Sequence, residues 1–157
     1  MTTPSSPARL LSTIQLTWAG DHRFDSGRPG GSTLRLDGSG ETGQSPVDAV
    51  MSALAACTAV DVVDILAKRR TPLSALSIDA IGTRADTTPK RIVSAELTYH
   101  LTGEGVDRTH AERAIELAIT KYCSVRDTLD PDLPIHYRAV LNGEAGELRV
   151  AGASGEG

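Results

Sequence analysis

Two cysteines are the residues of this chain whose type and setting favour chemistry. Cys57 lies among alanines and valines in "SALAACTAV", and Cys123 lies 66 residues further on in "ITKYCSVRD". A free cysteine is among the most buried residue types, so either one alone fits an inert core position. In a reducing compartment a permanent disulfide is rare, and a pair of cysteines there would act through transient thiol chemistry.

Other chemistries have less support in the residue patterns. The cysteines lack Cys-x-x-Cys spacing and the four histidines are dispersed, so the pattern does not predict a metal site. No Gly-rich stretch is followed by Lys-Ser/Thr as in a phosphate-binding loop, and no G-x-S-x-G marks a serine hydrolase. We therefore expect no metal and no organic cofactor, which leaves thiol chemistry.

Composition limits the classes of partner. The chain has 157 residues, enough for one compact domain, and 39% of them are hydrophobic, which supports an ordered core. The net charge is −4 with both signs interspersed, so nucleic acid is not an expected partner. The apolar run from Val47 to Leu66 is interrupted by Asp48, Asp61 and Asp64, and is not expected to span a membrane. These features predict a soluble, cytoplasmic protein.

The elements that would position the cysteines follow from periodicity. Alternating residues over 12–18, a short strand near Phe24 and residues 32–37 predict a three-stranded antiparallel meander. From Pro46, with Ser45 as N-cap, to about Arg70 the sequence predicts a helix that is apolar on most of its circumference. Because a chain this small cannot bury such a helix alone, we expect an obligate homodimer.

The second half predicts a long hairpin over 73–105, then an amphipathic helix over 107–123 with Asp107 as N-cap, then a strand over 133–141. Residues 1–9 form an expected flexible leader, 10–141 the domain, and 142–157 a flexible Gly-rich tail. Strands, a long helix, strands and a further helix define the α+β class.

The stretch "SPVDAVMSALAACTAVDVVDILAKRR", followed by "KYCSV", resembles the OsmC/Ohr superfamily of thiol-dependent peroxidases, and most of all its YhfA-like branch. The resemblance covers roughly residues 12–141. It implies an OsmC-like fold: antiparallel sheets packed around a long central helix, in an intertwined homodimer whose sites use residues of both subunits. It also implies that Cys57 is the attacking, peroxidatic cysteine and Cys123 the resolving one.

The sequence departs from the family pattern around the first thiol. Ser45-Pro46-Val47 occupies the family's Asn-Pro-Glu stretch, so the nearest acid is Asp48, one step round the helix. The family also uses an arginine from the N-terminal loop. A thiolate, not a thiol, attacks a peroxide, and an apolar helix disfavours the thiolate, so Cys57 needs a nearby cation. We rank Arg23 first, beside Phe24, with Arg28 and Arg84 as alternatives.

Cys123 has its own cations, Lys121 and Arg126, which would favour its thiolate. The expected function is reduction of organic hydroperoxides by a two-cysteine cycle as defence against oxidative stress, with catalytic residues Cys57, Cys123, Arg23 and Asp48 and with an external dithiol as reductant. Two alternatives remain open. One is a redox-sensing or electrophile-handling thiol protein of the same fold, and the other is a non-enzymatic dimeric binding module for an apolar ligand.

Overall fold

The computed structural model describes residues 9–152, and the chain divides into two compact units, residues 1–49 and 50–157. The sequence predicts one domain over 10–141, whereas the division falls in the first turn of the long helix. It arises because the N-terminal strands form a sheet of their own. Of the expected leader, residues 1–8 lie outside the described residues.

The first unit contains the predicted antiparallel meander of β1 (Gln15–Trp18), β2 (Arg23–Gly27) and β3 (Thr33–Asp37). Its register pairs Trp18 with Phe24 and Phe24 with Leu36, so these apolar residues share one face. Trp18 is 68% exposed and Leu34, on the same face, is 50% exposed. This apolar face of the sheet is therefore largely exposed to solvent.

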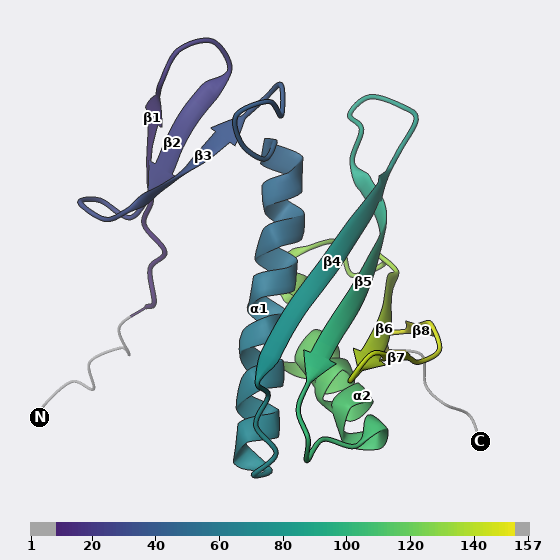
Figure 1. The fold of residues 1–157 in the computed structure, drawn as a ribbon. Coiled ribbons are helices and arrows are strands. Elements are labelled where there is room, and N and C mark those ends of the chain that lie inside the picture. The colour runs from purple at the N-terminus through teal and green to yellow at the C-terminus, as the bar shows by residue number, and fades with distance from the viewer. Residues whose placement is uncertain (1–8, 153–157) are drawn as a thin grey trace, which may run out of the picture. The chain divides into compact units, whose positions relative to one another are not determined.

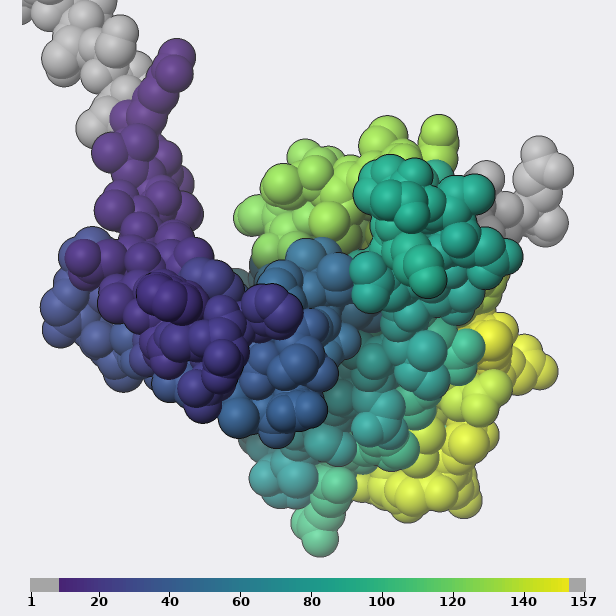
Figure 2. All heavy atoms as spheres, turned by 90° about the horizontal axis from the view of Figure 1, so that it is seen from above, coloured from purple at the N-terminus to yellow at the C-terminus, as the bar shows by residue number. Residues whose placement is uncertain are grey.

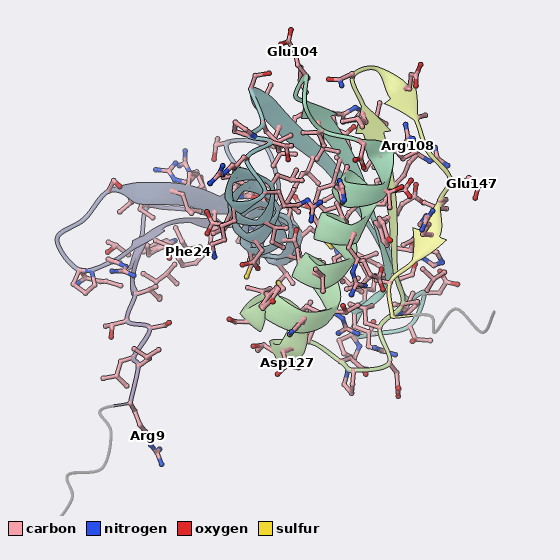
Figure 3. The ribbon with its side chains drawn as sticks, turned by 90° about the horizontal axis from the view of Figure 1, so that it is seen from below. Arg9, Phe24, Glu104, Arg108, Asp127 and Glu147 are labelled. Carbon is pink, nitrogen blue, oxygen red and sulfur yellow. The ribbon has the colours of Figure 1, made fainter. Side chains whose placement is uncertain are left out.

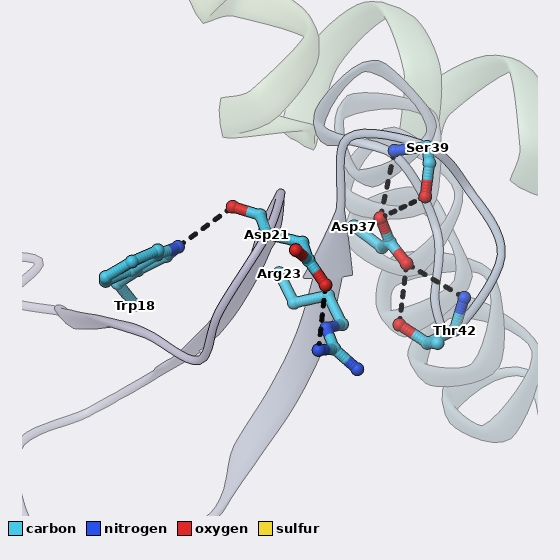
Figure 4. Close-up of polar contacts among 6 residues, drawn as sticks. All are labelled: Trp18, Asp21, Arg23, Asp37, Ser39 and Thr42. Carbon is cyan, nitrogen blue, oxygen red and sulfur yellow. Dashed lines mark hydrogen bonds and ion pairs between the residues drawn. The ribbon is translucent and has the colours of Figure 1, made fainter.

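The loop after β3 is organised by one carboxylate. Asp37 is 2% exposed and accepts hydrogen bonds from the backbone N–H and hydroxyl groups of Ser39 and Thr42, at 2.6–3.0 Å (Figure 4). These donors hold the pKa of Asp37 well below its usual range. The charged carboxylate closes the loop 37–42, which leads into the long helix.

The long helix, α1, runs from Pro46 to Lys68 and confirms the predicted element. The Ser45 hydroxyl accepts from the Asp48 N–H and the Asp48 carboxylate accepts from the Ser45 N–H, a capping box that satisfies two helix-end donors. Five side chains at helical spacing are buried: Met51, Leu54, Thr58, Val62 and Leu66. The opposite side is not, since Val60 is 61% and Val63 43% exposed.

Among the described residues, α1 alone is long and apolar enough to cross a membrane. The core helix of a soluble protein passes the same test, so one such helix is weak evidence for a span. The buried stripe of α1 belongs to the hydrophobic core of the second unit, together with strand and helix residues from the rest of that unit. We therefore treat α1 as a core helix.

The sheet of the second unit has the order β4-β5-β6-β7, with β8 also paired to β6. Its strands are β4 (Ala75–Arg84), β5 (Ile92–Thr102), β6 (Ile135–Leu141), β7 (Glu144–Ala145) and β8 (Arg149–Val150) (Figure 1). Alternate residues of β5 and β6 are fully buried and their neighbours are half-buried. One face of the sheet therefore carries the core that α1 and α2 (Arg108–Leu117) share.

The predicted β4–β5 hairpin is present and antiparallel, but β5 and β6 pair in parallel. The sequence does not predict this parallel pair; it follows because the helical segment 108–128 connects the two strands as a crossover. Figure 2 shows the end of this crossover, in light green, beside the teal β4–β5 hairpin, where Arg91 and Asp130 form an ion pair at 3.4 Å.

The sequence predicts a flexible tail over 142–157, but residues 142–152 are part of the fold. Arg149 donates to buried Glu112 at 2.7 Å, and the Gly152 N–H donates to Glu116 at 2.9 Å. Arg108 donates to the Glu144 carbonyl at 2.7 Å, at the edge where Figure 3 labels Arg108 and Glu147. These charged contacts bind β7 and β8 to α2, a role that the Gly-rich composition hides. Residues 153–157 lie outside the described residues.

Candidate functional site

Cys57 and Cys123, far apart in the sequence, are neighbours in the second unit. The Cys57 side chain is close enough to Cys123 to contribute to the raised pKa of its thiol, and both cysteines are free. Cys57 lies on α1, half-buried, and Cys123 is 4% exposed and packed in the core. The fold thus brings together two sulfur atoms that could join without a large movement of the chain.

A local irregularity delivers Cys123 to this position. After α2 the chain forms a π-helical turn, η1 (Ala118–Tyr122), in which the Cys123 N–H reaches back to the Ala118 carbonyl at 2.9 Å. The backbone of Cys123 is extended, and its sulfur accepts from the Arg126 N–H at 3.2 Å, which caps α3 (Ser124–Thr128). π-turns inside helices are rare and are frequent at functional sites.

Burial determines the charge state of Cys123. Burial, with a smaller contribution from the adjacent Cys57 side chain, raises the pKa of Cys123 to about 11, against the lowering effect of the Arg126 N–H. The sequence predicts that Lys121 and Arg126 favour a thiolate here, and this expectation is wrong. Arg126 donates its guanidinium hydrogens to the Asp130, Pro131 and Leu133 carbonyls instead.

Next to the thiols lies a buried pair of hydroxyls that the sequence does not single out. Thr58 and Tyr99 are both fully buried, and their oxygens are 2.7 Å apart. Thr58 donates to the Ala55 carbonyl, so Tyr99 is the donor to Thr58. Burial raises the pKa of Tyr99, and the nearby Cys123 contributes to the rise. The only available signal was Tyr99 at an inward position of an alternating strand.

Arg23, the first-ranked cation, lies on β2 of the first unit. Its guanidinium pairs with Asp21 at 3.1 Å, and Trp18 donates its indole N–H to the Asp21 carbonyl (Figure 4). The Arg23 Nε is buried and, within residues 9–152, has no hydrogen-bond acceptor. One carboxylate and one unused buried donor leave this arginine capacity for a further acceptor, and its role beside a thiol stays a prediction.

The other candidates have identifiable partners as well. Asp48 accepts from Ser45 in the helix cap, which is the ordinary role of a first-turn acid. Arg84 donates to the Lys90 carbonyl within the β4–β5 hairpin, while Arg28 lies in the loop between β2 and β3. Both cysteines belong to the second unit, whereas Asp48, Arg23 and Arg28 belong to the first. The catalytic role of Asp48 also stays a prediction.

Within the part of the chain that the structure describes, no group of three or more His, Cys, Asp or Glu side chains could hold a metal ion. What the site contains is a dithiol pair and a pair of buried hydroxyls. Such a pair can lose two electrons to form a disulfide and regain them from an external thiol.

An α+β fold with a dithiol between a long helix and the β5–β6 crossover defines a class of thiol proteins. The family model "OsmC-like protein" matches residues 38–138, and the chain belongs to this family. The chain is 30% identical over 112 residues to Protein YhfA of Escherichia coli strain K12, a match that covers 71% of this chain and 84% of that protein.

Solved structures agree on the fold. An OsmC-like protein from Mycoplasma pneumoniae matches with a TM-score of 0.72 at 18% identity, over 85% of this chain and 99% of that one. The organic hydroperoxide resistance protein OhrB of Bacillus subtilis matches with a TM-score of 0.58 at 15% identity, over 83% of this chain and 99% of that one. The predicted α+β, OsmC-like fold is therefore confirmed.

Proposed function

We propose that this protein reduces organic hydroperoxides by a two-cysteine cycle, as defence against oxidative stress. The observation that carries the proposal is the proximity of Cys57 and Cys123, whose thiols interact although 66 residues separate them in the sequence. Membership of the OsmC-like family supports it, and so does the fold shared with a hydroperoxide resistance protein.

In the first step the Cys57 thiolate attacks the distal oxygen of the hydroperoxide. The O–O bond breaks, an alcohol leaves after taking up a proton, and Cys57 becomes a sulfenic acid, oxidised by two electrons. The Cys123 thiol then condenses with the sulfenic acid, which forms the Cys57–Cys123 disulfide and releases water. An external dithiol returns both electrons and both protons.

Exposure and protonation support this division of roles. Cys57 is half-buried and therefore more accessible to a substrate than Cys123, which is 4% exposed. Because burial raises the pKa of Cys123, this residue is a thiol at neutral pH and a weak first nucleophile. As the neighbour of Cys57, however, it is well placed to resolve a sulfenic acid.

Three further assignments belong to the proposal. Arg23 holds Cys57 as the thiolate, and Asp48 orients that arginine in place of the family glutamate. The molecule is a homodimer, because the exposed side of α1 around Val60 and Val63 and the apolar face of the first unit need cover. A cytoplasmic location is part of the same proposal.

The direct test is a count of free thiols before and after one equivalent of cumene hydroperoxide. Loss of two thiols per chain, with an intrachain disulfide found by mass spectrometry, is the result we expect. Slow loss only at large excess would favour the redox-sensing or electrophile-handling alternative, which the raised pKa of Cys123 makes worth testing. No loss of thiols would favour the second alternative, a non-enzymatic dimeric binding module for an apolar ligand.

Two variants serve as matched controls for this assay. Cys123→Ser should stop the cycle at a sulfenic acid on Cys57, which dimedone would trap. Cys57→Ser should leave Cys123 reduced under the same conditions. A sulfenic acid on Cys123 in place of Cys57 would reverse the assigned roles.

The arginine has its own test. Replacement of Arg23 by Ala should slow hydroperoxide reduction about tenfold or more, since the Cys57 thiolate loses its counter-ion. Arg28→Ala, from the neighbouring loop, is the matched control and should react at the wild-type rate. Equal rates for wild type and Arg23→Ala would remove Arg23 from the site.

A further inference from the structure

A cavity opens beside Cys123. The proposed reaction with hydroperoxide and the formation of the disulfide do not use this cavity. Its volume is about 470 Å³, and it is lined by residues 119–124 and 126–128. The lining therefore comes from the π-turn η1, from α3 and from the cysteine between them. Asp127, labelled in Figure 3, marks this helical segment. A volume of several hundred Å³ is typical of small-molecule sites.

The position of the cavity matters for thiol–disulfide exchange. The attacking thiolate approaches one sulfur of a disulfide in line with the S–S bond, from the side opposite the sulfur that leaves. Cys57 would hold its sulfur from α1, whereas every lining residue of the cavity comes from 119–128. Cys123 lines the cavity and Cys57 does not, so a thiol bound in the cavity lies next to Cys123.

The charges at the cavity differ from those of the whole chain. The net charge of the chain is −4, but the lining contributes two cations, Lys121 and Arg126, and one carboxylate, Asp127. The guanidinium of Arg126 is fixed by three neutral carbonyls, which orient it without cancelling its charge. The Lys121 ammonium lies 5.3 Å from the centre of the Tyr122 ring. This local excess of positive charge favours an anionic molecule.

We infer that the cavity beside Cys123 admits a low-molecular-weight thiol carrying carboxylate groups, which reduces the Cys57–Cys123 disulfide by attack on Cys123. The inference rests on the proposed two-cysteine cycle, but it replaces the external dithiol of that cycle with two molecules of a small monothiol. It selects a small anionic thiol over a protein dithiol, because the site is a cavity with cations in its wall.

The exchange is balanced in two steps. The first thiolate forms an S–S bond with Cys123 and breaks the Cys57–Cys123 bond, and Cys57 leaves as a thiolate that takes up a proton. A second molecule of the thiol then attacks the mixed disulfide, which releases the oxidised thiol dimer and Cys123. Two molecules of thiol are oxidised and one protein disulfide is reduced.

The expulsion of Cys57 also agrees with the leaving-group rule. The sulfur with the lower thiol pKa leaves faster in thiol–disulfide exchange. Because burial raises the pKa of Cys123, that residue is a poor leaving group and is better suited to be the sulfur attacked. Access and leaving-group ability therefore both favour attack on the Cys123 sulfur and departure of Cys57.

The test begins from disulfide made with diamide, so that it does not depend on hydroperoxide chemistry. The oxidised protein is reduced with glutathione or with glutathione diethyl ester, which has no free carboxylate, and rates are compared per thiolate. We expect glutathione to be faster. Lys121→Glu should slow glutathione about fivefold or more and the diester little. Lys68→Glu makes the same charge change near the end of α1 and should match wild type.

The second readout is the position of the mixed disulfide. With limiting glutathione and rapid alkylation, peptide mass spectrometry should find glutathione on Cys123 and the alkyl group on Cys57. Glutathione on Cys57, or equal rates for both reductants and both lysine variants, would overturn the inference. If the diamide-made disulfide behaves as expected but hydroperoxide does not produce it, the peroxidase proposal alone fails. If diamide forms no Cys57–Cys123 disulfide, both fail.

Discussion

At the scale of single residues, the thiol pair depends on buried polar groups that the fold must satisfy. The Tyr99 hydroxyl donates to Thr58, and Thr58 donates to Ala55, so neither oxygen is left unpaired in the core. A buried polar group without a partner costs about 1–3 kcal/mol, whereas replacement of both partners by apolar groups of the same shape can be nearly neutral. The pair therefore behaves as a unit.

A double-mutant cycle tests this unit. Tyr99→Phe and Thr58→Val should each lower the free energy of unfolding by about 1 kcal/mol, because each removes the hydrogen bond between the two hydroxyls and leaves the remaining hydroxyl without that partner. The double variant should be more stable than the sum of the two losses predicts, by about 1 kcal/mol. Urea unfolding of the four proteins measures this, and strict additivity would show that the two hydroxyls do not depend on each other.

The protonation of Cys123 gives a second prediction at this scale. Since burial raises the pKa of Cys123 to about 11, its alkylation by iodoacetamide should reach half of its maximal rate near pH 11. In urea the same cysteine should titrate near the ordinary value of about 8.5. The unfolded chain then releases the proton first, so this group lowers stability as the pH rises from about 9 to 11. A midpoint below pH 9 in the folded protein would contradict the assignment.

At the scale of elements, the loop 37–42 shows how one charge determines a local structure. Asp37→Asn removes the charge, and the amide oxygen can accept from only two of the four donors of Ser39 and Thr42, while the amide NH2 faces the other two. Trp18, the single tryptophan of the chain, lies on the same sheet and reports on its unfolding. At pH 7 the variant should unfold at lower urea concentration, as seen in tryptophan fluorescence.

The pH dependence of this effect has a defined sign. The folded-state pKa of Asp37 is lowered, so its stabilising contribution is complete above the unfolded value of about 3.9 and is lost as the pH falls through the folded value. The advantage of wild type over Asp37→Asn should thus persist to about pH 4 and shrink below it. Glu41→Gln, an exposed acid of the same loop, is the control and should change neither quantity.

Periodicity predicted strands over 12–18 and 32–37, a hairpin over 73–105 and a helix from 46 to about 70, and the structure has these elements at 15–18, 33–37, 75–84, 92–102 and 46–68. The prediction succeeds because apolar residues recur at regular spacing in each of these elements. Periodicity did not predict η1, because it places residues 118–122 in one continuous amphipathic helix over 107–123. It also did not predict the pairing of β8 with β6, where Arg149 forms an ion pair with Glu112, because a contact between distant residues leaves no local pattern.

The candidate site divides in the same way. The two cysteines were found from the resemblance, while their proximity and the burial of Cys123 came only from the structure. Lys121 and Arg126 are adjacent to Cys123 in sequence, yet the extended backbone at Cys123 directs Arg126 to loop carbonyls. Sequence neighbours of a thiol therefore do not determine its charge state, which burial dominates here.

At the scale of the whole molecule, two apolar surfaces need an explanation. One is the side of α1 around Val60 and Val63, and the other is the face of the first unit around Trp18 and Leu34; all four residues are at least 43% exposed. Exposed apolar surface of this kind typically marks an interface. In a homodimer, which the proposal requires, a second copy would remove both from water.

A charge placed on one of these surfaces separates the homodimer from a monomer. Val60→Glu should lower the molar mass measured by light scattering from that of two chains to that of one, because a buried unpaired carboxylate opposes association. Ile81→Glu is the matched control: Ile81 is 62% exposed, close to the 61% of Val60, but alternates outward on β4 away from the core. It should leave the dimer intact. A wild-type protein that already has the mass of one chain, or equal dissociation by both variants, would show that the exposed side of α1 is not the interface, and the proposed site would then have to function with the residues of one chain.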